Sequence, residues 1–148
     1  MSFCKLNYHI IFATKFRSPI IVPEVEKQIY TLLFNILKQN KCHVHRIGGM
    51  FDHVHILTDV PQTIRLSDLV RELKSKSSHI IKNQRILPVW PGWQDGVGLF
   101  SVSYGNLVTV KNYIMNQKEH HRKVTFLEEY RRILIEEGID PESPYFPK

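Results

Sequence analysis

Cysteine and long apolar runs are both scarce in this chain. Cys4 and Cys42 are the only cysteines among its 148 residues, and they form no CxxC pair. This excludes a zinc ribbon and a disulfide framework, and it fits a reducing cytosol. The apolar run at 20–22 is far too short for a membrane span, which needs about 20 apolar residues. Residues 1–5 show no charged leader with a long apolar stretch behind it. We therefore expect a cytoplasmic protein with no membrane partner.

Acidic residues are fewer than basic ones. The chain has 14 Asp and Glu against 20 Lys and Arg, which gives a net charge of +6 and a pI of about 9.4. This balance favours a polyanionic partner, of which nucleic acid is the commonest. The length and a hydrophobic fraction of 43% predict one globular domain over residues 1–148.

The spacing of apolar residues predicts an α+β protein. The predicted core is a ferredoxin-like βαββαβ unit, in which helices cover an antiparallel sheet. Two C-terminal helices follow it, and residues 139–148, with three prolines, are expected to form an extended tail. The expected elements are strands at 3–14, 42–47, 53–60 and 99–104, and helices at 23–37, 66–81, 106–120 and 125–137. Ser67 is the expected cap of the second helix, Gly48 and Gly49 lie in the expected hairpin connection at 48–52, and Thr125 with Glu128 has capping-box spacing.

A pair of histidines, His53 and His55, lies on a predicted strand. Side chains alternate along a strand, so both imidazoles project from one face and can share a divalent ion. His43 and His45 have the same spacing. An H-x-H triplet is more often a pair of ordinary surface or packed histidines, so the pattern by itself is a weak indication.

A tyrosine and an amide lie four residues apart in the third predicted helix. Tyr113 and Gln117 therefore share one helix face. Such a polar face is usually only a solvated surface.

The two patterns together resemble a known family. Residues 48–57, GGMFDHVHIL, resemble the signature hairpin of the HUH single-tyrosine transposases of the simplest bacterial insertion sequences, the insertion-sequence-200-like family. Residues 113–117, YIMNQ, match that family's second motif, and residues 93–103, 119–121 and 126–130 resemble the segments around it. Phe51 stands where the family pattern has a small residue or proline. The resemblance implies that Tyr113 is the nucleophile and that His53, His55 and Gln117 hold the metal.

The same resemblance implies an activity and its partners. Family members cleave single-stranded DNA by tyrosine attack, which leaves a 5′-phosphotyrosine and a free 3′-hydroxyl, and they recognise hairpins near the ends of the element. The implied cofactor is Mg²⁺, with Mn²⁺ able to substitute, and the implied assembly is a homodimer. Basic side chains are expected to contact DNA phosphates, although each taken singly is more often a solvated residue. The candidates are Lys15, Arg17, Arg71, Lys74, Lys76, Lys82 and Arg85.

Three alternatives remain open at this point. A non-catalytic nucleic-acid-binding domain of the same fold would bind in a salt-sensitive way, indifferent to metal and to Tyr113→Phe. A domesticated relative would keep the chemistry but act on chromosomal palindromes. In a metal-dependent hydrolase the histidines would activate water and Tyr113 would be structural.

Overall fold

The computed structural model describes residues 3–144 and 146. Its longer elements connect through loops and two short 3₁₀ turns, at Lys15–Arg17 and Tyr104–Asn106. In chain order the elements are β1 (Asn7–Ala13), α1 (Pro23–Gln39), β2 (Val44–Met50), β3 (His53–Asp59), α2 (Leu66–Asn83), β4 (Gly98–Val102), α3 (Leu107–Met115), α4 (Gln117–His120) and α5 (Phe126–Glu136).

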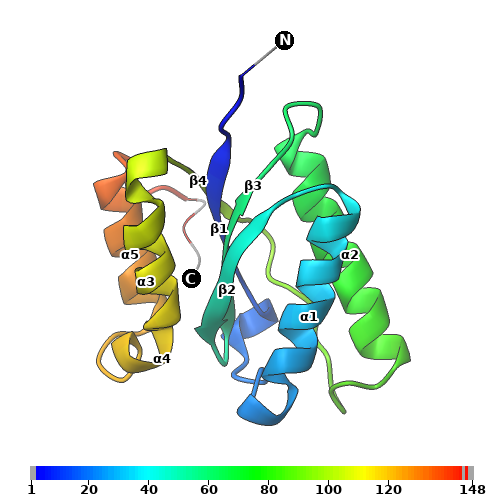
Figure 1. The fold of residues 1–148 in the computed structure, drawn as a ribbon. Helices are drawn as coiled ribbons and strands as arrows, with labels where there is room; N and C mark the ends of the chain where they lie inside the picture. The colour runs from blue at the N-terminus through cyan, green and yellow to red at the C-terminus, as the bar shows by residue number, and fades with distance from the viewer. Residues whose placement is uncertain (1–2, 145, 147–148) are drawn as a thin grey trace.

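The four strands form one sheet in the order β2-β3-β1-β4, with every neighbouring pair antiparallel. This confirms the ferredoxin-like prediction, because each βαβ half is split by a strand from the other half. β3 lies between β2 and β1, and His55 pairs with Ile11 on one side and Gly48 on the other. The histidine strand is therefore central and well supported (Figure 1).

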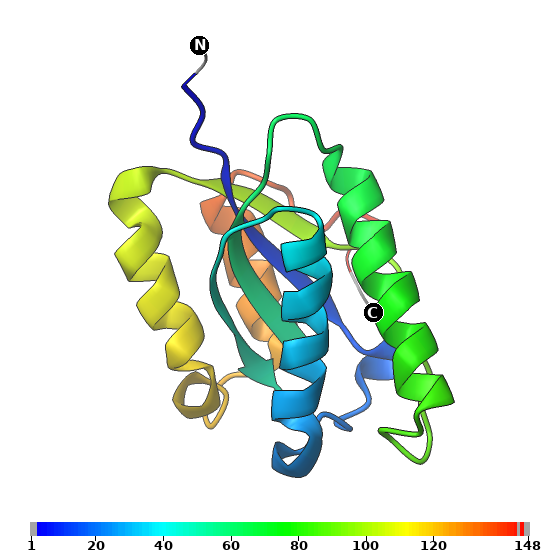
Figure 2. The ribbon, with the colours of Figure 1, turned by 45° about the vertical axis from the view of Figure 1, so that its right-hand side comes forward.

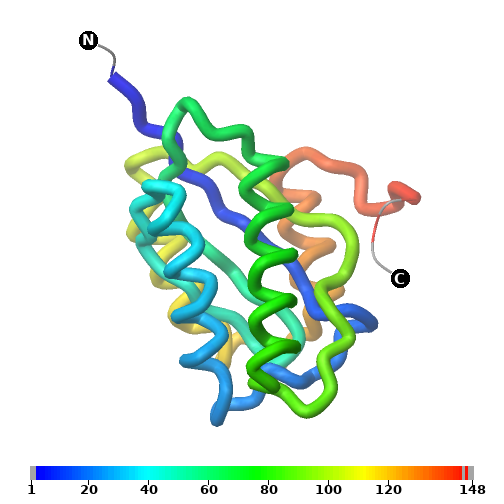
Figure 3. Tube along the Cα trace, turned by 90° about the vertical axis from the view of Figure 1, so that its right-hand side faces the viewer, coloured from blue at the N-terminus to red at the C-terminus, as the bar shows by residue number. Residues whose placement is uncertain are grey.

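Helices cover both faces of the sheet. Helices α1 and α2 lie against one face, and the two C-terminal helices of the prediction lie against the other (Figures 1 and 2). In Figure 3, α1 and α2 run side by side in front of the sheet, with the yellow and orange helices behind it.

Alternation along the strands sends apolar side chains into two cores. Ile10 and Phe12 of β1 and Val54 and Ile56 of β3 join the larger core under α1 and α2. Ile11 and its neighbour Ala13 face the smaller core formed with α5. Because Val54 points toward α1 and α2, the side chains on either side of it point toward the C-terminal helices.

The glycine pair lies in β2, which corrects the predicted hairpin connection. The strands meet across a tight turn at 51–52, and Gly48 and Gly49 pair with His55 and Val54. A Cβ on Gly48 would lie 2.8 Å from the Ile114 side chain of α3. Glycine is needed here for the close approach of a helix to the sheet.

Several element ends also differ from prediction. β1 begins at Asn7 instead of residue 3. α2 begins at Leu66 as predicted but extends to Asn83, and its N-cap is Arg65 instead of Ser67. The third predicted helix is two helices, because Asn116 leaves helical geometry at φ −97° and ψ 15°. The Thr125 cap is confirmed, since the Glu128 amide donates to its hydroxyl at 3.2 Å.

The described part of the tail forms turns instead of the predicted extended chain. Asp140 accepts hydrogen bonds from the amides of Glu142 and Ser143, the first through its side chain and the second through its carbonyl. Residues 145, 147 and 148 of that prediction lie outside the described part. Within residues 3–144 and 146 no helix combines the length and the apolar character needed to cross a membrane.

Candidate active site

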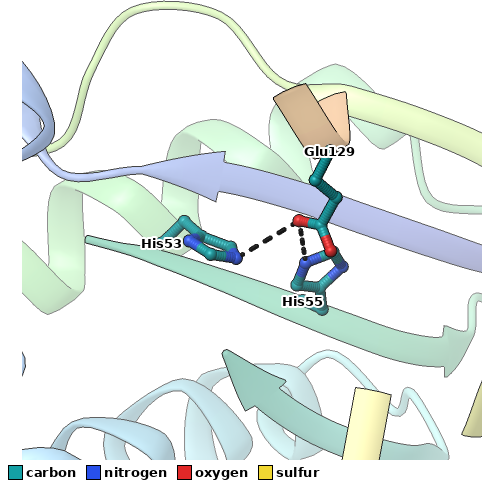
Figure 4. Close-up of side chains that lie close together, drawn as sticks. All are labelled: His53, His55 and Glu129. Atoms are coloured by element: carbon teal, nitrogen blue, oxygen red, sulfur yellow. Dashed lines mark hydrogen bonds and ion pairs between the residues drawn. The ribbon is translucent and has the colours of Figure 1, made fainter. Parts of the chain in front are cut away.

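The two histidines of β3 point at one carboxylate. His53 and His55 project toward the C-terminal helices and are both fully buried. Their Nε2 atoms lie 3.4 Å and 3.1 Å from Oε1 of Glu129, which comes from α5 and is also fully buried (Figure 4).

The other ring nitrogen of each histidine, Nδ1, contacts a residue that does not touch Glu129. Nδ1 of His53 lies 2.7 Å from Oδ1 of Asp52, and Nδ1 of His55 lies 2.7 Å from Nε2 of His9 on β1. Since a carboxylate oxygen only accepts hydrogen bonds, the proton of the first pair belongs to Nδ1 of His53. Such outer partners fix the rings and leave Nε2 aimed inward, as they do in metal sites.

Tyr113 and Gln117 reach the same cluster in spite of the break at Asn116. Gln117 places Oε1 3.1 Å from Nε2 of His53, and its Nε2 donates to Oε2 of Glu129 at 2.8 Å. The Tyr113 hydroxyl donates to the same Oε2. The structure thus brings together all four residues that the motifs single out, around Glu129.

A second pair of histidines, His120 and His121, also faces Glu129. Their Nε2 atoms lie 3.5 Å from Oε2 and 3.2 Å from Oε1, respectively. Both Nε2 atoms are buried and have no hydrogen-bond partner among the described residues. Nδ1 of His121 lies 2.7 Å from the Val124 carbonyl, which orients that ring.

The charges of the cluster are strongly coupled. Burial alone would raise the pKa of Glu129, but the surrounding imidazoles of His121, His53 and His55 hold it well below its usual range. Burial opposes protonation of His53, yet hydrogen bonds to Asp52 and Glu129 outweigh it and raise its pKa to about 9. Burial lowers the pKa of His55 to about 4.

The phenol of Tyr113 is neutral at rest. Burial and the adjacent Glu129 carboxylate both raise the pKa of Tyr113 above its ordinary value. Arg132 acts in the opposite direction, since its Nη2 donates to the phenol oxygen at 3.1 Å. A nucleophilic role therefore requires loss of the phenol proton in a site that already contains an acceptor and a cation.

The first histidine pair does not join this cluster. Nε2 of His45 lies 3.1 Å from Oδ1 of Asn7, and its ring packs against that of His43. Both lie at the start of the edge strand β2, while Met50 at its other end pairs with His53. Among the described residues, the groups able to hold a metal include neither of them.

The predicted DNA-contact residues fall into two sets. Lys15 and Arg17 lie at the end of the sheet where β3 begins, because the adjacent Thr14 amide donates to the Asp52 carbonyl at 2.9 Å. The remaining five lie on or just after α2, on the face opposite the cluster. Of these, Lys74 donates to the Gln94 carbonyl at 2.8 Å, and the full set is Arg71, Lys74, Lys76, Lys82 and Arg85.

Several residues of the cluster are not identified by the sequence motifs. Glu129 follows the capping-box Glu128 directly, and His121 belongs to a histidine doublet, so both stand in segments that resemble the family. Nothing in the spacing indicates that His9 or Arg132 would reach the same point.

The donors of the cluster suit a divalent ion. His53, His55 and Glu129 offer two imidazoles and a carboxylate whose ligand atoms lie within 4.8 Å of one another, and Gln117 adds an amide oxygen beside them. Nitrogen and oxygen donors of this kind suit manganese, iron, cobalt or zinc, and magnesium when oxygen ligands dominate.

Comparisons with known proteins agree with this site. A family model described as "Transposase IS200 like" matches residues 2–117. The ISDra2 transposase TnpA of Deinococcus radiodurans is 28% identical over 120 residues, covering 78% of this chain and 86% of that protein. The IS200 transposase of Salmonella typhimurium is 28% identical over 81 residues, and the match spans about half of each protein, 55% of this chain and 52% of the other.

Two solved structures share the architecture. A putative transposase from Deinococcus radiodurans R1 superposes with a TM-score of 0.62 at 30% identity, covering 78% of this chain and 93% of that one. A REP-associated tyrosine transposase bound to a REP hairpin has a TM-score of 0.64 at 12% identity, covering 100% and 92%, and is similar in fold. Because the family model covers well over half of the chain and includes Tyr113, Gln117 and both histidines of β3, this chain belongs to the IS200-like transposase family.

Proposed function

We propose that the chain is a metal-dependent DNA transposase that cleaves and rejoins single-stranded DNA through a 5′-phosphotyrosine formed on Tyr113. The observation that carries this proposal is the convergence of Tyr113, Gln117, His53 and His55 on one buried cluster. Tyr113 and Gln117 come from α3 and α4, and the two histidines come from the central strand β3. Packing of these helices against the sheet therefore brings the four side chains together.

The proposed reaction exchanges one phosphoester for another. The phenol oxygen of Tyr113 attacks the scissile phosphorus, the bond to the 3′ oxygen breaks, and the phosphate remains joined to tyrosine on the 5′ side. The phenol loses its proton and the departing 3′ oxygen gains one. A 3′-hydroxyl of another DNA end then reverses the attack, so the exchange needs no ATP.

The chain's own residues prepare the phenol. Glu129 accepts the hydrogen bond of the Tyr113 hydroxyl and is placed to take its proton. Arg132 donates to the phenol oxygen at 3.1 Å, where its charge stabilises the phenolate as it forms. Of the two contacts only Arg132 opposes the burial that raises the pKa of the tyrosine, whereas the Glu129 carboxylate raises that pKa further while it accepts the phenol proton.

His53, His55 and the Gln117 oxygen are the residues proposed to hold Mg²⁺, with Mn²⁺ able to substitute. When bound there, a divalent ion would stabilise the negative charge that develops on the scissile phosphate. The inward aim of both Nε2 atoms supports this assignment, because outer partners hold the other nitrogen of each ring.

The proposed partners are single-stranded DNA with hairpins and a second copy of this chain. The REP-associated transposase of similar fold is bound to a REP hairpin, which supports a hairpin as substrate here. Lys15 and Arg17 lie at the His53 end of the sheet, where the adjacent Thr14 amide donates to the Asp52 carbonyl. The five basic residues on and after α2 remain proposed contacts for DNA that continues around the molecule.

A denaturing gel tests the proposal. Purified protein is mixed with single-stranded DNA from the flanks of its gene and Mn²⁺, beside Tyr113→Phe, His53→Ala and the control His45→Ala. A metal-dependent covalent adduct is expected with wild type and the control, and none with the other two. Cleavage that survives Tyr113→Phe without an adduct would instead indicate a hydrolase. Tight binding without any cleavage would leave a nucleic-acid-binding domain.

A further inference from the structure

Glu129 is a buried carboxylate that lies outside the two motifs at 48–57 and 113–117. It lies on α5, beyond the matched residues 2–117, and its side chain is fully buried. Its contacts are four imidazoles, the phenol of Tyr113 and the amide of Gln117. Burial of an ionised carboxylate costs free energy because it loses its water, and this cost is tolerated only when charged or hydrogen-bonding partners compensate for it.

The distances around Oε1 match those between two ligands of one ion. Oε1 lies 3.1 Å from Nε2 of His55 and 3.4 Å from Nε2 of His53. Metal–ligand bonds of about 2.1 Å place neighbouring ligand atoms about 3.0 Å apart in octahedral and about 3.4 Å apart in tetrahedral geometry. Oε1 therefore already stands in the ligand shell that the two imidazoles define (Figure 4).

The atoms around Nε2 of His53 also form a set of ligands for one ion. Asp52 holds Nδ1 of His53 at 2.7 Å, so Nε2 is the nitrogen that faces Oε1 of Glu129 at 3.4 Å and Oε1 of Gln117 at 3.1 Å. An imidazole nitrogen and two oxygen atoms that converge in this way suit a divalent ion.

We propose that Glu129 is a protein ligand of the same divalent ion as His53 and His55, so that the centre is a two-histidine, one-carboxylate site. Gln117 supports this arrangement, because its amide nitrogen holds Oε2 at 2.8 Å while its own oxygen stays beside His53. Oε2 also accepts a hydrogen bond from the Tyr113 hydroxyl. The Glu129 side chain therefore connects the proposed metal ion to the proposed nucleophile. The proposal rests on the proposed function only for the presence of a metal at the histidine pair.

A carboxylate ligand changes which ions the site favours. Two imidazoles and an amide carry no charge, whereas a Glu129 ligand adds one negative charge and a hard oxygen. Two histidines and a carboxylate are the ligand set of open sites for divalent iron and related transition ions. The carboxylate strengthens the binding of either ion through its charge, while the two imidazoles favour Mn²⁺ over Mg²⁺.

The competing explanation is that the Glu129 carboxylate contacts the imidazoles only when no metal is bound. In that case it moves away from them when an ion binds. The two explanations predict opposite effects of Glu129→Gln on metal affinity. A ligand carboxylate makes the variant bind Mn²⁺ at least 10-fold more weakly, while a competing carboxylate makes it bind as tightly as wild type or more tightly.

The experiment is a Mn²⁺ titration without DNA, with free Mn²⁺ followed by electron paramagnetic resonance. Wild type is compared with Glu129→Gln, Glu129→Asp and His53→Ala, and the exposed neighbour Glu128→Gln is the matched control. We expect Glu129→Gln to raise the Kd at least 10-fold, Glu129→Asp to retain part of the affinity, and Glu128→Gln to stay within 2-fold. Circular dichroism with chelator present establishes that each variant is folded.

A Co²⁺ titration gives a second readout. The visible absorption of bound Co²⁺ depends on its ligands, so Glu129→Gln is expected to shift the spectrum and Glu128→Gln to leave it unchanged. Equal or tighter Mn²⁺ binding by Glu129→Gln overturns the ligand role, whatever the adduct assay gives. Weakened Mn²⁺ binding in a chain whose wild type forms no adduct overturns the proposed transposase chemistry and leaves the ligand role standing.

Discussion

His9 supports the active-site cluster from the neighbouring strand. Its side chain is buried, and its Nε2 lies 2.7 Å from Nδ1 of His55. Burial first, and then the charge of His55, lowers the pKa of His9 to about 3, while the pKa of His55 falls to about 4. In the unfolded chain both rings take up protons below about pH 6.5. Their contribution to stability is therefore complete above that pH and is lost as the pH falls toward 3.

The first prediction is that His9→Gln makes stability less sensitive to acid. Each proton taken up only by the unfolded chain changes the free energy of unfolding by about 1.4 kcal/mol per pH unit. Urea unfolding between pH 7 and 4.5, in chelator, measures the slope. We expect a shallower slope than in wild type, with His79→Gln on the exposed side of α2 as control. His53 acts in the opposite direction: with a pKa raised to about 9, its contribution is complete below about pH 6.5 and is lost as the pH rises toward 9, so most of that loss falls above this window.

Arg132 contacts the phenol but none of the proposed metal ligands, so its removal tests activation of Tyr113 without affecting metal binding. It donates to the Tyr113 oxygen at 3.1 Å, and its guanidinium lies over the same ring. Arg132→Ala is expected to slow adduct formation about 10-fold under single-turnover conditions, because a partly exposed donor stabilises less charge than a buried one. Mn²⁺ affinity should not change. Arg131→Ala, which removes an ion pair with Glu142, is the matched control, and equal rates for the two variants would contradict the role of Arg132.

Sequence motifs lead to Tyr113, Gln117, His53 and His55 but not to the residues that hold them. The pair His9 and His55 is separated by 46 positions, and Glu129 lies 74 positions from His55. Short spacing shows which side chains share a strand face or a helix face. It does not show which of 14 acidic residues reaches that face, because this depends on how α5 packs against the sheet.

At the scale of elements, the order of strands and helices follows from apolar periodicity, but the two glycines of β2 illustrate its limit. A glycine pair between alternating segments indicates a turn just as well as a close contact. Only the position of α3 shows that Gly48 is needed for contact. The break at Asn116 is equally hidden, since residues 115–117 contain neither glycine nor proline.

Gly48 determines how closely α3 approaches the sheet. A Cβ there would lie 2.8 Å from both the Ile114 side chain and its carbonyl oxygen, so α3 would have to move. We predict that Gly48→Ala lowers the free energy of unfolding by about 1–3 kcal/mol, as overpacking does, and slows adduct formation because Tyr113 moves with its helix. Gly105→Ala is the control, since a Cβ at that position would meet nothing within 4 Å. Similar urea midpoints for the two variants would show that α3 is free to shift.

At the scale of the whole molecule, the predicted DNA contacts come from two different elements. Lys15 and Arg17 lie at the His53 end, while Lys76 and Lys82 lie on α2 behind the sheet. We predict that Lys15→Gln with Arg17→Gln weakens DNA binding and lowers adduct yield at limiting DNA. Each lost phosphate contact on a single strand reduces the slope of log K against log salt by about 0.7. The double variant Lys76→Gln with Lys82→Gln should lower adduct yield much less. A larger loss of adduct in this second variant than in the first would mean that DNA reaches the site across α2.

The arrangement of the tyrosine helix also bears on how two copies would work together. Within one chain, Tyr113 and Gln117 already contact Glu129, and Gln117 contacts His53. We therefore predict that catalysis is completed within a single chain even in a homodimer. Tyr113→Phe mixed with His53→Ala should form no more adduct than either alone, after co-refolding to allow exchange. Light scattering on the same samples establishes whether dimers are present. Restored adduct in a dimeric mixture would require Tyr113 of one copy to serve the histidines of the other, which means that α3 leaves the contact with Gly48 that it makes in this structure.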